Sequence, residues 1–414
     1  MLEKDRQTLR GLALQAAEIA ALPVQKKTIA LWRDNNDLKP VSRPPVYMDQ
    51  LPWHEIDRAP EMQLCCEDPF LRRVEQDFRR LLFRWKHFPC DMIVRPFYDL
   101  EKSVTGLNYG IHVLEDTLAT DAGNDVISHA YIDQLQTSEA VQALQADLIE
   151  TDAALDERRR AQLEEIFGDV LPVRLAGVSI HSGVWDRIAQ MRSVTNALED
   201  LIEDPELIVE TVNKFVWLTQ RTVDQCEALG LLDPMLSYIH CTGAFTEALP
   251  VETGLDRPAT AKDCWSFGMA QMFSTVSPKM HEEYEIELVR PLYQRFGLMY
   301  YGCCEPLHHK ISIVRKLDNV RKISVSPWAD IDVAAENIGG DYVFSSKINP
   351  AFLAVDFSRD AIVDQVEHVL EATRRNGTPA ELILKDVSTV QYDITRLERW
   401  HDLVMSLVGK EDCP

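Results

Sequence analysis

The sequence is poor in basic residues and has no long apolar run. It contains 43 lysines and arginines against 66 aspartates and glutamates, which gives a formal net charge of −23. Phosphate backbones are bound by clustered lysine and arginine, so nucleic acid is excluded as the main partner. No apolar run reaches the roughly 18 residues of a membrane span, and the start of the chain lacks the apolar core of a signal peptide. We expect no membrane insertion and a cytoplasmic location.

A disulfide framework is not expected either. The nine cysteines are odd in number, and they include two adjacent pairs, Cys65-Cys66 and Cys303-Cys304. Frameworks of secreted proteins have paired cysteines in short chains, so reduced thiols are expected here. Hydrophobic residues make up 46% of the 414 residues and charged residues 26%, which is typical of a folded protein with a core.

The first part of the chain has helical periodicity. Apolar residues recur at helical spacing over 6–37, and Pro23 should divide this stretch into two helices. A further amphipathic helix is predicted over 67–88. We expect residues 1–90 to form an N-terminal helical extension, either a cap over the strand ends or a dimerisation arm. A homodimer is one possibility that follows.

From residue 91 to residue 414 the pattern alternates between short apolar runs and amphipathic stretches. An acidic helix is expected near 138–168. Eight strands are predicted, at 46–48, 92–97, 173–180, 235–241, 298–303, 321–325, 341–345 and 381–386. Helices are predicted at 204–229, 278–296, 306–316, 359–376 and 394–409. Strand–helix alternation with short loops is typical of parallel βα units, so we predict an α/β protein with a (β/α)8 TIM barrel at 91–414. An open doubly wound sheet is the alternative, although no glycine-rich dinucleotide loop follows a strand.

In such barrels the reactive groups lie at the carboxyl ends of the strands. The densest group of candidate metal ligands is Cys303-Cys304-Glu305, and His240 ends another predicted strand. Thiolate, imidazole and carboxylate are ligands of Zn²⁺, so these four residues are our candidate metal site. The alternative is that the cysteines are small buried apolar residues and His240 is a hydrogen-bonded core residue. Adjacent residues of an extended segment point to opposite sides, so only one cysteine should face the barrel mouth.

Other strand ends supply further candidates. His54 beside Glu55 could be a ligand or an acid–base residue, or could belong to an ordinary helix start. Trp185-Asp186 could provide a stacking face and a carboxylate, or Asp186 could cap a helix. Trp328 follows the strand at 321–325 and is a candidate substrate-binding residue. Lys385-Asp386 follows the last strand, as substrate-binding and catalytic groups or as an ion pair at the rim.

Several segments point to a known superfamily. They are Ser277-Pro278, the strand into Cys303-Cys304-Glu305, the stretch 324–330, and Lys347-Ile348-Asn349-Pro350. Over 174–409 the chain resembles the uroporphyrinogen decarboxylase superfamily, which also contains cobalamin-dependent and cobalamin-independent methyltransferases. The resemblance implies a (β/α)8 barrel.

Three positions depart from the superfamily patterns. Asp49 stands where the decarboxylases have an arginine that holds substrate carboxylates. Tyr301 stands where the thiol methyltransferases have a histidine ligand. The stretch Lys385-Asp386-Val387-Ser388 has no cysteine where these methyltransferases have a distant ligand.

The leading hypothesis is a zinc-assisted methyltransferase or demethylase. It would move a methyl group between a small substrate and a thiol or a corrinoid carried by a partner protein. Cys303 would hold the metal with Cys304, Glu305 and His240, and Tyr301 and Asp386 would position the substrate. One alternative is a metal-free decarboxylase of another acid, which needs cations such as Arg95, Arg192 and Lys385 at the mouth. The other is a non-catalytic barrel that binds a tetrapyrrole or corrinoid.

Overall fold

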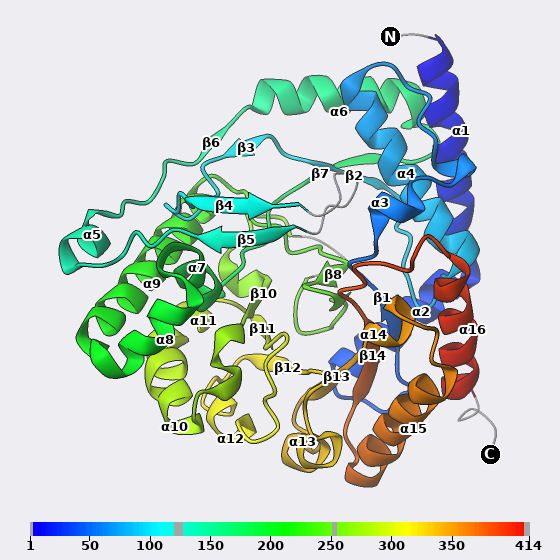
Figure 1. The fold of residues 1–414 in the computed structure, drawn as a ribbon. Coiled ribbons are helices and arrows are strands. Elements are labelled where there is room, and N and C mark those ends of the chain that lie inside the picture. Colours follow the sequence, from blue (N-terminus) through cyan, green and yellow to red (C-terminus); the bar gives the residue numbers. More distant parts are fainter. Residues whose placement is uncertain (1–2, 120–126, 251–254, 410–414) are drawn as a thin grey trace.

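The computed structural model describes residues 3–119, 127–250 and 255–409. Its central feature is a curved sheet of six parallel strands in the order β1-β14-β13-β12-β11-β10 (Figure 1). The strands are β1 (Val46–Met48), β10 (Trp265–Gly268), β11 (Leu298–Tyr301), β12 (Val320–Val325), β13 (Val343–Ile348) and β14 (Ala380–Leu384). The predicted α/β class with parallel βα units is confirmed.

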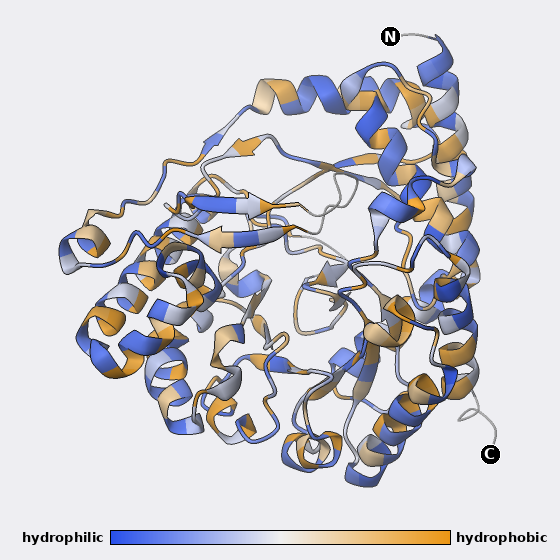
Figure 2. Ribbon diagram, viewed as in Figure 1, coloured by the Kyte–Doolittle hydropathy of each residue, from blue (hydrophilic) through white to orange (hydrophobic). Residues whose placement is uncertain are grey.

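Helices cover the outer face of this sheet. They connect consecutive strands, as expected for parallel pairs that need a crossover. The connecting helices are α10 (Pro278–His281), α11 (Glu287–Tyr293), α12 (Ile311–Val314), α13 (Ile331–Ile338), α14 (Ala351–Ala354) and α15 (Arg359–Asn376), and α16 (Thr395–Gly409) follows β14. Most of these helices carry an apolar and a polar side (Figure 2).

The described residues do not form one closed sheet of eight strands. A separate parallel pair joins β2 (Tyr98–Glu101) to β7 (Val173–Ala176). Among the described residues, an isolated bridge from His181 to Phe267 links this side to β10, and a second bridge joins Val178 to Leu232. The structure therefore shows a six-stranded curved sheet with a loosely attached pair, and not the complete barrel that we predicted.

Two predicted strands were wrong, and one strand of the central sheet was missed. Residues 92–97 form no strand, because the Ile93 amide donates to the Tyr238 hydroxyl and the Val94 amide donates to the Gln25 side chain. The predicted strand at 235–241 is reduced to β8 (Tyr238–Ile239), which pairs antiparallel with β9 (Thr242–Gly243). The missed strand is β10, which pairs with β11 along its whole length.

Two apolar cores lie on the two faces of the sheet. The inner core, on the concave face, is built from side chains that include Tyr47, Trp265, Leu298, Tyr300 and Ile383. The outer core, between sheet and helices, includes their strand neighbours Met299, Tyr301, Leu382 and Leu384. Because side chains alternate along a strand, this separation fixes which residues can reach the interior.

The second of the two N-terminal helices closes the amino end of the sheet. Pro23 separates α1 (Glu3–Ala20) from α2 (Pro23–Asn36), as predicted. Trp32 of α2 is fully buried in the inner core, and the Asn36 side-chain amide donates to the carbonyls of Gly243 and Phe245 at 2.9 and 2.7 Å. This part of the predicted extension therefore covers the opposite end from the strand carboxyl ends. The extension also contributes β1 to the sheet.

Further elements surround these layers. They are α3 (Trp53–Ile56), α4 (Pro69–His87), β3 (Val104–Thr105), β4 (Glu115–Leu118), β5 (Ser128–Tyr131), α5 (Ser138–Ala143), β6 (Glu150–Thr151), α6 (Ala153–Phe167), α7 (Val184–Arg192), α8 (Val194–Glu203) and α9 (Pro205–Ala228). The single helix predicted at 138–168 is thus two helices separated by β6. In the described ranges we find no helix with the length and apolar character of a membrane span.

Candidate functional site

Five polar side chains meet at the carboxyl ends of the strands. The ammonium nitrogen of Lys385, directly after β14, lies 3.1 Å from the Cys303 sulfur and 3.4 Å from His240 Nε2. The sulfurs of Cys303 and Cys304 are 3.6 Å apart. Asp386 Oδ2 lies 3.3 Å from Lys385 Nζ and 3.9 Å from the Cys304 sulfur. We call these five residues the thiol–lysine cluster.

The loop after β11 sets the position of both sulfurs. Gly302 has φ +92°, and a Cβ there would meet the Leu307 side chain at 2.5 Å, so only glycine fits this turn. Residues 303–305 then form a bend instead of an extended strand. The prediction that the cysteines point to opposite sides is therefore wrong: Cys303 is buried and Cys304 is exposed, yet their sulfurs are in contact.

His240 is a neutral hydrogen-bond acceptor in this cluster. Burial, reinforced by the charges of Lys385 and Lys347, lowers the pKa of His240 to about 2. Its ring packs on Phe267 with centroids 4.9 Å apart. His240 and Asp386 both have positive φ, 54° and 58°, which is uncommon outside glycine. Such backbone conformations concentrate at functional sites.

The two thiols are joined by a hydrogen bond that shifts their pKa values in opposite directions. The hydrogen bond from Cys303 to Cys304 raises the pKa of the Cys303 thiol, with burial adding to the effect, and the same bond lowers the pKa of Cys304. Burial lowers the pKa of the Lys385 ammonium, but the nearby side chains of Cys241 and Cys303 raise it by more. The pKa of Lys385 is therefore raised. The cluster therefore favours a thiolate on the exposed sulfur beside a fixed positive charge.

A second lysine–thiol pair lies deeper in the interior. Lys347 of β13 places its ammonium 3.0 Å from the Cys241 sulfur and 2.9 Å from the Ser345 hydroxyl. It also lies 5.0 Å from the centroid of the Tyr300 ring. The sequence reasoning ended this strand at residue 345 and so missed Lys347 as a site residue. The available signal was a lysine inside an otherwise buried strand, which is rare without a partner.

Glu305 does not join the cluster. Its carboxylate accepts hydrogen bonds from the Cys303 and Ala270 amides at 2.9 and 3.2 Å, and the side chain is fully buried. Burial raises the pKa of Glu305 to about 7 against those hydrogen bonds. Glu305 holds the loop in place instead of facing His240.

Two further predicted site residues belong to the outer core. Tyr301 points away from the interior, and its hydroxyl lies 2.8 Å from His281 Nε2, because the inward position of β11 is Tyr300. Trp185 is fully buried, and its Nε1 donates to the Tyr284 carbonyl. The structure therefore contradicts direct substrate roles for Tyr301 and Trp185.

Three predicted site residues remain, Asp186, Trp328 and His54. Asp186 accepts a hydrogen bond from Gln271 at 2.8 Å, and burial raises its pKa. Trp328 is 69% exposed. His54 packs beside Glu55, with 3.6 Å between Nε2 and Oε1. Their predicted roles stay predictions.

The cluster does not fit a divalent metal ion. Across the three described ranges, no three or more histidine, cysteine, aspartate or glutamate side chains are grouped as metal ligands. Two of the four proposed ligands, Cys303 and His240, instead contact the Lys385 ammonium, and Glu305 is bound to backbone amides. A positive charge among the donors opposes a second cation, so we derive no step through zinc.

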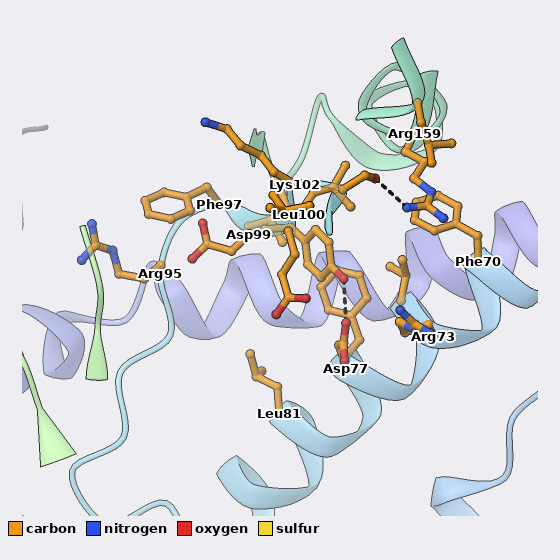
Figure 3. Close-up of a pocket in the computed structure, with 18 of the residues that line it drawn as sticks. Phe70, Arg73, Asp77, Leu81, Arg95, Phe97, Asp99, Leu100, Lys102 and Arg159 are labelled. Carbon is orange, nitrogen blue, oxygen red and sulfur yellow. Dashed lines mark hydrogen bonds between the residues drawn. The ribbon is translucent and has the colours of Figure 1, made fainter. Parts of the chain in front are cut away.

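A cavity of about 1350 Å³ lies elsewhere, beside α4 and β2 (Figure 3). Its walls carry both charge signs, including Asp77, Lys102 and Arg159, and none of its lining residues is a cysteine or histidine. Within it the Tyr98 hydroxyl donates to Asp77 and Arg159 donates to Ser103. Reactive groups and this large cavity are thus separate, and we place the candidate active site on the thiol–lysine cluster.

Comparison with known proteins gives little beyond this geometry. No family model and no curated protein matches the chain. Among solved structures, the chain is similar to a methyltransferase from Methanosarcina mazei, with 11% identity and a TM-score of 0.49 over 92% of this chain and 98% of that chain.

Proposed function

We propose that this protein is a methyltransferase whose reactive group is the Cys303–Cys304 thiol pair. The observation that carries the proposal is the contact of 3.1 Å between the Lys385 ammonium and the Cys303 sulfur at the strand ends. A fixed cation beside a thiol favours the thiolate, which is the nucleophilic form. The resemblance of the strand-end segments to the superfamily that contains methyltransferases supports methyl as the transferred group.

The proposed step uses both sulfurs. The Cys304 thiolate attacks the methyl carbon of a small donor in which that carbon is bonded to a heteroatom. A carbon–sulfur bond forms, the carbon–heteroatom bond breaks, and the heteroatom leaves with the electron pair. It takes the proton that Cys303 holds. The new Cys303 thiolate then lies against the Lys385 ammonium, which stabilises the charge.

Two neighbours would position the cluster. His240 is neutral, so its Nε2 accepts a hydrogen bond from Lys385 and orients the ammonium. Asp386 holds Lys385 from the solvent side, where its side chain is about half exposed. The second acceptor of the methyl group would be a free thiol or a corrinoid carried by a partner protein.

The test measures methylation of individual cysteines. Native protein is treated with an isotopically labelled methyl sulfonate ester, and peptides are quantified by mass spectrometry over time. We expect Cys304 to be methylated at least tenfold faster than Cys65, the matched exposed cysteine of the other adjacent pair. K385M should reduce the Cys304 rate about tenfold and leave Cys65 unchanged. Equal rates at Cys304 and Cys65 in the wild-type protein would overturn the proposal.

A second candidate is decarboxylation of a small acid. Lys347 and Lys385 both enter the buried interior, and two cations there could hold a carboxylate. Of the three predicted cations, however, only Lys385 is in the cluster. Arg192 pairs with Asp133 and Asp200, and Arg95 lines the cavity beside β2. Release of labelled carbon dioxide from a panel of carboxylates, lost in K347M while Cys304 methylation persists, would favour this second activity.

A further inference from the structure

The adjacent cysteines combine one accessible and one protected sulfur. Cys304 is exposed, Cys303 is buried, and their sulfurs lie 3.6 Å apart. Thiol–disulfide exchange needs an accessible attacking thiolate and, for completion, a second thiol within reach of the first. Both conditions hold after β11.

We propose that Cys303 and Cys304 form a two-electron thiol–disulfide exchange site for low-molecular-weight disulfides. The site is the one used in the proposed function, but the inference does not depend on methyl transfer.

The exchange proceeds in two steps. The Cys304 thiolate attacks one sulfur of a small disulfide, a mixed disulfide forms, and the first small thiolate leaves. The Cys303 sulfur, on losing its proton, then attacks the Cys304 sulfur, and the second small thiolate leaves. The protein dithiol is oxidised to a Cys303–Cys304 disulfide, two electrons reduce the small disulfide to two thiols, and the protons of the protein thiols go to the products.

Lys385 assists the second step. Its ammonium lies 3.1 Å from the Cys303 sulfur and favours the thiolate that must attack. The Cys303 amide is fixed by the Glu305 carboxylate at 2.9 Å, so the loop holds the resolving sulfur in place.

The oxidised form should be easily reduced. Consecutive Cα atoms are about 3.8 Å apart, whereas disulfide-linked residues usually have Cα atoms about 4.4 to 6.8 Å apart. A bridge between neighbours is therefore strained, and strained disulfides have more oxidising potentials. The pair suits reversible exchange better than structural cross-linking.

The other adjacent pair provides an internal control. Cys65 is also exposed and Cys66 is also buried. There the sulfurs are directed to different carbonyl groups, Cys65 toward Gln63 at 3.8 Å and Cys66 toward Asp5 at 4.0 Å, and the Cys65 sulfur also accepts from the Arg79 guanidinium at 3.7 Å. The two pairs thus both have a cation near the exposed sulfur and differ in the contact between the sulfurs. We expect Cys65 to form a mixed disulfide that Cys66 does not resolve.

The experiment counts released thiols. A chromogenic aromatic disulfide is added to native protein in which Cys65 and Cys413 (which lies outside the described residues) are serine. We expect two coloured thiols per chain and no retained adduct. In the same background C303S should release one thiol and keep an adduct on Cys304, and C304S should show no fast release. Restoring Cys65 should add one thiol with a retained adduct.

Each outcome bears on the proposal. In the protein without Cys65 and Cys413, release of only one thiol per chain with an adduct retained on Cys304 would overturn the proposal. The absence of a fast release of thiol would also overturn it. Labelling of the buried Cys226 or Cys264 would reveal unfolding, so mass spectrometry of their peptides checks that each variant is folded. If exchange proceeds while Cys304 methylation fails, the methyltransferase proposal is wrong and this inference stands. If Cys304 is methylated but no exchange occurs, this inference is wrong and the methyltransferase proposal stands.

Discussion

The two ends of the curved sheet each hold a buried lysine, but their partners differ. At the amino end, Lys322 lies 2.8 Å from the Glu381 carboxylate, and both side chains are completely buried. It also donates to the Thr242 hydroxyl and the Gly243 carbonyl, and the Trp32 ring lies 5.3 Å away. At the carboxyl end, the corresponding partners of Lys385 are a thiol, a neutral imidazole and a partly exposed carboxylate.

The different partners indicate different roles: Lys322 stabilises the fold, and Lys385 lies among reactive groups. The amino end is a completely buried ion pair under a helix, in which the Lys322 ammonium has three acceptors, so its charge is not available to a ligand. The carboxyl end has groups with shifted pKa values, two non-glycine residues at positive φ and an exposed sulfur. Reactive groups belong at the carboxyl end of barrel-type sheets and stabilising groups at the other end, as found here.

The largest effect on stability is expected from a substitution at the amino end of the sheet. K322A leaves the Glu381 carboxylate buried without its cation, which should lower the free energy of unfolding by about 3 to 5 kcal/mol. Urea denaturation at neutral pH measures it. The double variant K322M/E381L removes both charges and should be close to wild type. A double variant as unstable as K322A would show that shape, and not charge, decides stability at this end.

The α/β class was predicted correctly from the sequence, but the described residues do not form the closed eight-stranded barrel that was predicted. Long periodic segments such as the helix at 359–376 and the strands at 298–303 and 321–325 were found where the structure has α15, β11 and β12. Residues 92–97 failed because their apolar side chains pack in the inner core while their amides bond to side chains. The strand β10 was missed because four residues with one serine and a final glycine give almost no periodic signal.

The candidate site was found in part for a physical reason. Parallel strands bring their carboxyl ends together, so listing strand ends was enough to find Cys303, Cys304, Lys385 and Asp386. His240 was named from a predicted strand that was wrong, and it lies in the turn between β8 and the antiparallel β9. The rule says nothing about which face a neighbouring residue takes. A shift of one position moves a side chain to the other face, as at Tyr301. Lys347 was missed because the strand was predicted at 341–345, whereas β13 extends to Ile348 and contains Lys347.

The next effect concerns Glu305, which supports the loop at the carboxyl end. Its pKa is raised from 4.5 to about 7, so between these values the folded state holds a proton that the unfolded state has lost. Stability from this group is present below pH 4.5 and is lost as the pH rises through about 7. The shift corresponds to about 3 kcal/mol.

The variant E305Q removes that titration. Its free energy of unfolding, relative to wild type, should therefore rise by about 3 kcal/mol between pH 4.5 and pH 8. Urea denaturation of both proteins across this range tests the sign. A constant difference would mean that Glu305 is ionised at all of these pH values, and the burial argument would be wrong.

The smallest effect on stability is expected at Lys385, although this residue matters most for the site. K385M keeps the length of the side chain and removes a buried charge. The buried neighbours that remain, the Cys303 thiol and the His240 imidazole, are neutral, and the Cys304 sulfur and the Asp386 carboxylate are exposed to solvent. The free energy of unfolding should therefore change by less than about 1 kcal/mol, because no charged partner is left buried. Urea denaturation beside K322M, which has the same substitution at the other end, measures the contrast. If K385M were as unstable as K322M, Lys385 would be a structural lysine like Lys322. The proposal that the carboxyl end is the reactive end would then be wrong.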